Sequence, residues 1–226
     1  MSKRLMLSGN MLKIIAAGAM LLDHLGLMFF PGNGIFRILG RLAFPIFAFM
    51  IAEGSKYTRN RLRYFGQLFG LATVCQAVYF LVDGSLYLSV LFTFSLSLGM
   101  IFALQAWKRQ PSTFYFLLFL AITWATWVLN RLFTIDYGFL GCMVPVTAAL
   151  PHGTKWDRKE VSVACLGLGL GLLAWDLGGW QVWSLAALPL LLLYSGQRGK
   201  ARMKYFFYLF YPAHLALLQV LAWILM

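Results

Sequence analysis

Long apolar runs, separated by short polar stretches, fill almost the whole chain. Each run approaches the length of about 20 residues that an α-helix needs to cross a bilayer, so the pattern predicts an all-α, polytopic transmembrane helix bundle. We place about nine spans, at residues 9–30, 36–55, 63–82, 86–107, 113–133, 137–151, 161–177, 180–196 and 204–225. The sixth to eighth spans are short, and we expect them to tilt, to pair or to be partly re-entrant.

Composition supports a membrane protein. The chain of 226 residues is 61% hydrophobic and 12% charged, whereas a soluble domain carries roughly a quarter charged residues. Turn-forming residues such as 31–34, 83–85 and 178–179 separate the runs, and they leave no room for a sizeable soluble domain. We therefore expect residues 1–226 to form a single integral membrane domain.

The distribution of basic residues predicts the orientation in the bilayer. The net charge of +12 would suggest nucleic acid as a partner of a soluble protein, but here membrane topology explains it and we expect no nucleic acid. If the N-terminus is cytoplasmic, all but four of the 19 basic residues lie in the N-terminal segment and the even-numbered connections, as the positive-inside rule requires. An odd number of spans then places the C-terminus outside. Lys3 and Arg4 precede the first run without a cleavage site, and we expect that run to be retained.

No metal site is predicted. The three cysteines, Cys75, Cys142 and Cys165, lie within apolar runs and lack a ligand spacing such as CxxC. They are expected to be small core residues.

Asp23 and His24 stand side by side within an otherwise apolar run. Ionisable side chains are costly in hydrocarbon, so those that persist there usually line a site or a pathway. On a helix, consecutive side chains diverge by about 100°. We therefore expect His24 to face a reaction space as a general base while Asp23 holds a nearby cation. A histidine hydrogen-bonded between helices is the alternative.

Further polar groups are predicted at similar depth in the second and last spans. Arg37 and Arg41 are four residues apart and share a helix face, and Arg41 at this depth needs an anion such as Asp23, Glu53 or a substrate. Pro45 cannot donate to the carbonyl of Arg41, so a kink is expected there. His214, two residues after Pro212, lies near the middle of the last span.

A basic collar is expected at the cytoplasmic end of the second and third spans. It comprises Lys56, Arg59, Arg61 and Arg63. Such a collar can bind the phosphates of a cofactor through charge-assisted hydrogen bonds, or it can set the topology and contact anionic lipids.

Three stretches together resemble the TraX family: NMLKIIAAGAMLLDHLG, FRILGRLAFPIFAFMIAEG and KYFFYLFYPAHLALL, with DYGFLG at 136–141 as a weaker landmark. The resemblance implies a multi-pass protein of the bacterial inner membrane that is associated with conjugation, with N-terminal acetylation of the pilin subunit as the best-known activity. It also implies a distant relation to membrane acyltransferases that use acyl-CoA and an intramembrane histidine. In this chain that histidine corresponds to His24.

The resemblance thus implies an acyl-CoA-dependent N- or O-acetyltransferase. Acetyl-CoA or another acyl-CoA would be the co-substrate, and a peptide, a pilin or a small envelope molecule would be the acceptor. We expect His24 to take the acceptor's proton or to carry the acyl group itself. Arg41 would stabilise the oxyanion or hold a negative group of the acceptor, and Asp23 and His214 would assist. The basic collar and Tyr211 are expected to bind the cofactor.

Two other functions fit the residues alone. A proton-coupled transporter or exporter also uses intramembrane Asp, His and Arg, and its spans are often kinked. A non-catalytic assembly factor would instead pack against a partner through glycine- and aromatic-rich spans.

Overall fold

The computed structural model describes residues 6–201 and 203–225, apart from the side chains of residues 82, 83, 204 and 205. The described chain is helical, without a strand, and two isolated β-bridges join Leu7 to Tyr194 and Leu88 to Ile135. The helices are α1 (Gly9–Phe29), α2 (Gly34–Gly40), α3 (Ala43–Tyr57), α4 (Arg61–Asp83), α5 (Val90–Arg109), α6 (Thr113–Leu132), α7 (Gly138–Ala149), α8 (Lys159–Leu177), the 3₁₀ helix η1 (Gly179–Ala187), α9 (Leu188–Leu192) and α10 (Lys204–Leu225).

These helices confirm the all-α, multi-pass prediction. Within the described ranges, seven helical segments are long and apolar enough to cross a membrane, and two shorter apolar ones correspond to the sixth and eighth predicted spans. The seventh predicted span, α8, is 19 residues long and belongs to the full-length group. The eighth differs most from a simple span, because it consists of a 3₁₀ helix followed by one short α-helix.

The chain forms two compact units, which are described separately. Unit 1 comprises residues 1–50 and 174–226, and unit 2 comprises residues 51–173. The single membrane domain expected from the sequence stays a prediction.

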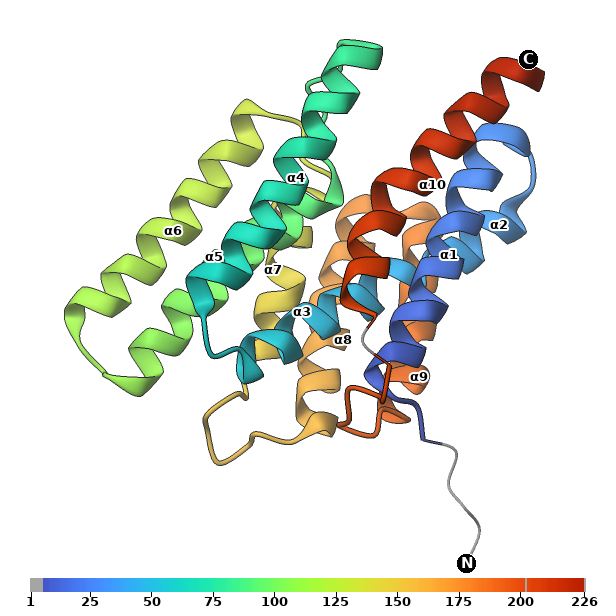
Figure 1. Ribbon diagram of the computed structural model, residues 1–226. Coiled ribbons are helices and arrows are strands. Elements are labelled where there is room, and N and C mark those ends of the chain that lie inside the picture. Colours follow the sequence, from blue (N-terminus) through green and yellow to red (C-terminus); the bar gives the residue numbers. More distant parts are fainter. Residues whose placement is uncertain (1–5, 202, 226) are drawn as a thin grey trace, which may run out of the picture. The chain divides into compact units, whose positions relative to one another are not determined.

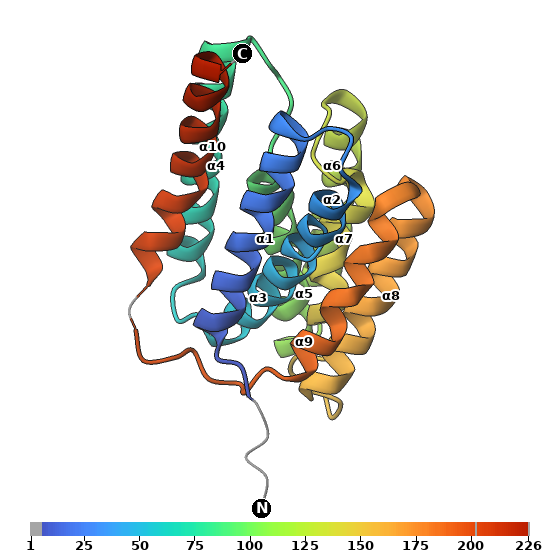
Figure 2. The same cartoon turned by 90° about the vertical axis from the view of Figure 1, so that its right-hand side faces the viewer.

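In unit 1, α1 and α2 form a tight helical hairpin, and α10 lies along α1 (Figures 1 and 2). Glycine permits the close approach of the hairpin. A Cβ atom at Gly26 would lie 2.3 Å from Cβ of Phe36, and one at Gly40 would lie 2.3 Å from Cβ of Asp23. The backbones can therefore approach only where a side chain is missing.

The second predicted span is broken between α2 and α3, where Arg41 and Leu42 form a turn. The break lies at the expected position, because Pro45 has no N–H to offer to the carbonyl of Arg41. Pro212, unlike Pro45, is not associated with a break, since α10 continues through it without interruption.

In unit 2, α5 packs against α4, α6 and α7, and α4, α5 and α6 run alongside one another in Figure 1. More than half of α5 is buried. The hydroxyl groups of Ser95 and Ser97 are satisfied by the carbonyls of Leu91 and Thr93 one turn earlier. By contrast, α6 exposes most of its apolar side chains, including Trp124 and Trp127, as a helix that faces lipid does.

Candidate functional site

Asp23 of α1 is the centre of an ionic cluster in unit 1. Its Oδ1 atom lies 3.0 Å from Nη1 of Arg37, and both of its carboxylate oxygens lie 2.9 Å from Nη2 of Arg41. The side chains of Asp23 and Arg41 are 16% and 12% exposed. The carboxylate thus ties the two consecutive helices α1 and α2 together.

Gly40 makes this ion pairing possible. It lies directly before Arg41 and faces Asp23, and a Cβ atom there would lie 2.3 Å from Oδ1 of the carboxylate. The missing side chain lets the carboxylate lie against the backbone of α2, within reach of both guanidinium groups.

His24 projects from another face of α1 and meets His214 of α10. The two ring centroids are 5.2 Å apart with an interplanar angle of 77°. His24 is partly exposed, whereas His214 is buried. As expected from the helical geometry, Asp23 holds cations while His24 is directed elsewhere.

Main-chain contacts fix the tautomers of both imidazoles. Nδ1 of His24 lies 2.8 Å from the carbonyl oxygen of Met20, and Nδ1 of His214 lies 2.8 Å from that of Phe210. Because a carbonyl can only accept, each Nδ1 must carry a hydrogen and donate it. In the neutral rings, Nε2 is therefore an unprotonated acceptor. Among the described residues, Nε2 of His214 has no hydrogen-bond partner.

Aromatic rings hold His214 in place. Phe210 stacks on it at 4.9 Å with an interplanar angle of 9°, and Tyr211 contacts its edge at 5.8 Å. Tyr211, which the sequence assigns to cofactor binding, is thus a buried neighbour of the histidine pair.

Two residues that the sequence did not single out complete the cluster. Gln181 of η1 accepts a hydrogen bond at its Oε1 atom from Nη1 of Arg41, at 3.2 Å, and it is buried, as is Ser184 one 3₁₀ turn later. The available signal was a polar side chain in an otherwise apolar segment. We call the following residues the imidazole cluster: Asp23, His24, Arg37, Arg41, Gln181, Ser184 and His214.

The basic collar lies in unit 2, and its four members differ. Lys56 forms an ion pair with Asp157 at 2.6 Å. Arg61 donates to Oε1 of Gln105 at 3.3 Å and lies over the ring of Phe102. Arg59 and Arg63 are exposed. The cofactor-binding role of the collar stays a prediction, and two of its cations already have protein partners.

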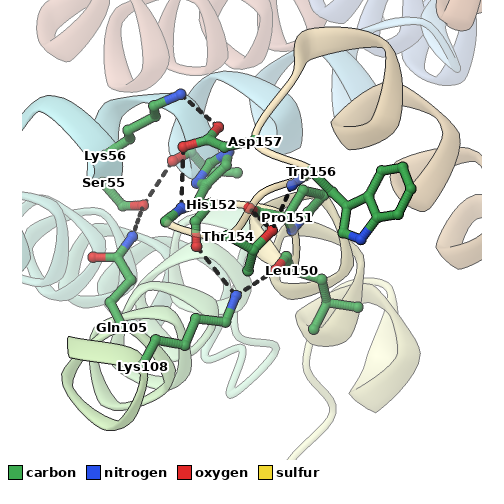
Figure 3. A network of polar contacts seen from close by, with 12 residues as sticks. Ser55, Lys56, Gln105, Lys108, Leu150, Pro151, His152, Thr154, Trp156 and Asp157 are labelled. Carbon is green, nitrogen blue, oxygen red and sulfur yellow. Dashed lines mark hydrogen bonds and ion pairs between the residues drawn. The ribbon is translucent and has the colours of Figure 1, made fainter. Parts of the chain in front are cut away.

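Lys56 belongs to a polar network around the loop between α7 and α8 (Figure 3). Lys108 donates to the carbonyls of Leu150 and His152, and Gln105 donates to Ser55 at 2.9 Å. Asp157 also accepts from the backbone N–H of Gly153 at 3.0 Å. We call these residues the loop network: Ser55, Lys56, Gln105, Lys108, His152 and Asp157.

Two titratable groups of this loop are perturbed. Burial lowers the pKa of His152 to about 4, even though the nearby carboxylate of Asp157 opposes the shift. For Asp157, partial burial acts to raise the pKa, but the hydrogen bonds from Lys56 and from Gly153 hold it below its usual value. At neutral pH the loop therefore contains a neutral histidine and an ionised aspartate.

The described residues contain no group of three or more His, Cys, Asp or Glu side chains able to hold a metal ion. The chemistry available to the imidazole cluster is proton transfer at the Nε2 atoms of two imidazoles whose ring centroids lie 5.2 Å apart.

Comparison with known proteins places the chain in a family. The family model described as "TraX protein" matches residues 8–222. The chain is 30% identical to the "Probable fimbrial assembly protein FimC, serogroup H1" of Dichelobacter nodosus, over 96% of this chain and 97% of the relative. It is 28% identical to an uncharacterised protein of Rickettsia prowazekii (strain Madrid E), over 66% of this chain and 58% of that protein. No solved structure matches.

Proposed function

Since this chain belongs to the TraX family, we propose that it is a membrane-embedded acyltransferase that moves an acyl group from acyl-CoA to an amine or hydroxyl acceptor. The observation that carries the proposal is the pairing of His24 with His214. In both rings, Nδ1 donates to a main-chain carbonyl, which leaves Nε2 as the proton acceptor.

His24 acts as the general base because it is the more exposed of the two imidazoles. Its Nε2 atom takes the proton of the acceptor while the acceptor's nitrogen or oxygen attacks the thioester carbonyl. The carbon–sulfur bond then breaks, and the CoA thiolate leaves with the proton that His24 carried. The products are the acylated acceptor and free CoA.

His214 supports this step from the buried side of the pair. Its ring is fixed by Phe210 and by its own Nδ1 hydrogen bond, so its Nε2 atom is a pre-oriented second acceptor. A neutral amine acceptor can then donate one N–H to each imidazole before it passes a proton to His24.

Asp23 and Arg41 act as positioning residues in this scheme. The terminal nitrogens of Arg41 are bound to Asp23 and Gln181, so its charge orients the cluster. Asp23 holds α2 against α1, one residue before His24 in the chain.

The acceptor is proposed to be the N-terminus of a pilin-type subunit or another envelope peptide. Support comes from the name of the Dichelobacter nodosus relative, a probable fimbrial assembly protein that aligns over almost its whole length. The protein would lie in the bacterial inner membrane with a cytoplasmic N-terminus. Acyl-CoA would then enter from the cytosol. We propose separately that the exposed cations Arg59 and Arg63 of unit 2 bind phosphate groups.

The direct test is acetyl transfer in lipid nanodiscs. Purified protein receives radiolabelled acetyl-CoA and a peptide that carries the N-terminus of a pilin from the same genome. Wild type should label the peptide, and His24→Gln should lower kcat at least about 100-fold, the usual contribution of a general base. His152→Gln is the matched control, since it removes a buried histidine of the loop network, and it should retain the activity.

Labelling that persists in His24→Gln would overturn the catalytic assignment. Wild-type protein that labels neither peptide nor hydroxyl acceptors, yet moves a solute in response to a pH gradient in liposomes, would replace the acyltransferase by a proton-coupled transporter.

A further inference from the structure

The 3₁₀ helix η1 is unusual for its length and position. It runs for nine residues through an apolar segment, whereas 3₁₀ runs longer than three to four residues are uncommon. Gly178 and Gly179, with φ angles of 63° and 53°, turn the chain into it. In a 3₁₀ helix, side chains three residues apart are eclipsed. Gln181 and Ser184 therefore lie one above the other on a single face.

Both side chains are buried and each has a polar atom without a partner. Gln181 is 4% exposed and Ser184 is 0% exposed. Among the described residues, neither the amide nitrogen of Gln181 nor the hydroxyl of Ser184 has a hydrogen-bond partner. Leaving a polar group unpaired in a protein interior costs about 1–3 kcal/mol, so two such groups on one face need an explanation.

Arg41 determines which atoms of Gln181 are available. Its Nη1 atom donates to Oε1 of Gln181. The opposite orientation of the amide would place the N–H donors of Gln181 against the guanidinium, which has no acceptor for them. The nitrogen of Gln181, with two N–H donors, therefore points away from Arg41. The positive charge of Arg41 polarises the amide and makes it a stronger donor.

The face of η1 thus offers an amide N–H and a hydroxyl as donors to an oxygen that carries negative charge. Arg41 links Gln181 to Asp23 of α1, and His24 is the next residue of that helix. An acyl group entering this cluster carries one such oxygen, that of its carbonyl.

We propose that Gln181 and Ser184 bind the acyl carbonyl oxygen and stabilise the oxyanion that forms on it. This inference rests on the proposed acyltransferase function. As the acceptor adds to the carbonyl carbon, the π-electron pair moves onto the oxygen, which then accepts hydrogen bonds from the amide of Gln181 and the hydroxyl of Ser184. When the carbonyl re-forms, the thiolate leaves and takes the proton held by His24.

Two variants test the donors separately. Gln181→Glu keeps an oxygen for Arg41 but removes both N–H donors. Ser184→Ala removes the hydroxyl without adding charge. With acetyl-CoA and the peptide acceptor, we expect kcat to fall about 100-fold or more in Gln181→Glu, the usual loss for one oxyanion donor. We expect a fall of about tenfold or more in Ser184→Ala, with KM for acetyl-CoA within about threefold in both.

Matched controls come from polar side chains that are buried and already paired. Ser95 is buried like Ser184, but its hydroxyl is satisfied by the carbonyl of Leu91, and Gln105 donates to Ser55. Ser95→Ala and Gln105→Glu should keep kcat and lower the thermal unfolding temperature. Ser184→Ala should leave that temperature unchanged or raise it, because it removes an unpaired group.

Infrared spectra of bound [1-¹³C]acetyl-CoA separate this inference from the proposed function. Donors on the carbonyl oxygen should lower its stretching frequency in wild type, and Gln181→Glu should abolish that shift. A wild type that turns over, with kcat and frequency unchanged in both variants, would overturn the donor assignment alone. A shifted carbonyl without turnover would uphold the donors and reject the acyltransferase. Neither shift nor turnover would reject both.

Discussion

The imidazole cluster of unit 1 and the loop network of unit 2 use similar residue types for different ends. In the loop network, the cations hold the loop between α7 and α8 in place: Lys56 pairs with Asp157, and Lys108 donates to two carbonyls just after α7 (Figure 3). In the imidazole cluster, the ion pairs join α1 to α2, and polar atoms of Gln181, Ser184 and His214 stay unpaired. Among the described residues of the loop network, only Nδ1 of His152 is unpaired. Polar groups thus mark a candidate catalytic site by the donors and acceptors that have no partner within the protein.

The largest expected effect comes from breaking the ionic centre of the imidazole cluster. Arg41→Met leaves the mostly buried carboxylate of Asp23 with one partner, Arg37, and should lower the free energy of unfolding by about 3–5 kcal/mol. Denaturation in detergent micelles measures this. Asp23→Asn added to Arg41→Met should recover at least half of the loss, because the uncompensated charge is gone.

The corresponding change in the loop network is expected to be smaller. The side chains of Lys56 and Asp157 are 30% and 22% exposed, so water screens the pair and Lys56→Met should cost about 1 kcal/mol or less. An equal or greater loss for Lys56→Met than for Arg41→Met would show that the two ionic clusters do not differ in this way.

After Arg41→Met, the next largest effect is expected from the pH dependence of the loop. Folding lowers the pKa of His152 from about 6.5 to about 4, so the open loop takes up a proton at a higher pH than the closed loop. The stability of the closed loop is complete above pH 6.5, and about 3 kcal/mol of it is lost as the pH falls to 4. Asp157, whose pKa is held low, keeps its contribution to the stability of the closed loop throughout that interval.

Amide hydrogen exchange of residues 150–158, corrected for the intrinsic exchange rate, measures this opening. Protection should fall between pH 6.5 and 4 in wild type, and His152→Gln should make it nearly independent of pH. Protection that is constant in wild type would show that His152 is not held neutral by burial.

A glycine substitution tests the close contact between α1 and α2. Gly40→Ala forces a methyl group onto the carboxylate of Asp23, and such overpacking costs about 1–3 kcal/mol. Gly18 of the same hairpin has open space at the Cβ position. Gly18→Ala is therefore the control and should stabilise the helix by up to about 1 kcal/mol. Similar unfolding temperatures for the two variants would contradict the tight approach at Gly40.

The smallest effect is expected at the exposed part of the basic collar. Arg59→Gln with Arg63→Gln should change the free energy of unfolding by no more than about 0.5 kcal/mol. The double variant should bind acyl-CoA about two- to tenfold more weakly, and its affinity should be less sensitive to salt. Binding measured by calorimetry at two salt concentrations checks this, and an unchanged affinity would remove the exposed collar from the cofactor site.

The sequence predicted the features that follow from charge and periodicity. Because a buried arginine needs an anion and consecutive helical side chains diverge, Asp23 was expected to hold a cation while His24 points elsewhere. The break after Arg41 followed from Pro45. The convergence of His214 on this region followed from the depth of the residues in their spans.

Other parts of the cluster depend on backbone geometry that periodicity does not reveal. The three-residue spacing of Gln181 and Ser184 does not reveal whether they lie on an α-helix or on a 3₁₀ helix. Only the hydrogen-bond pattern of the backbone distinguishes the two. The partners of Lys56 and Lys108 depend on how the 150–158 loop folds back, and no local motif encodes that contact.

The tautomers of the histidines decide whether Nε2 of His24 is available as a base. The chain contains only His24, His152 and His214, so ¹⁵N-histidine spectra of the protein in nanodiscs can be assigned with three His→Gln variants. In their neutral form, His24 and His214 should each show a protonated Nδ1 and an unprotonated Nε2. A protonated Nε2 on His24 would leave the proposed base without a lone pair and would contradict the account.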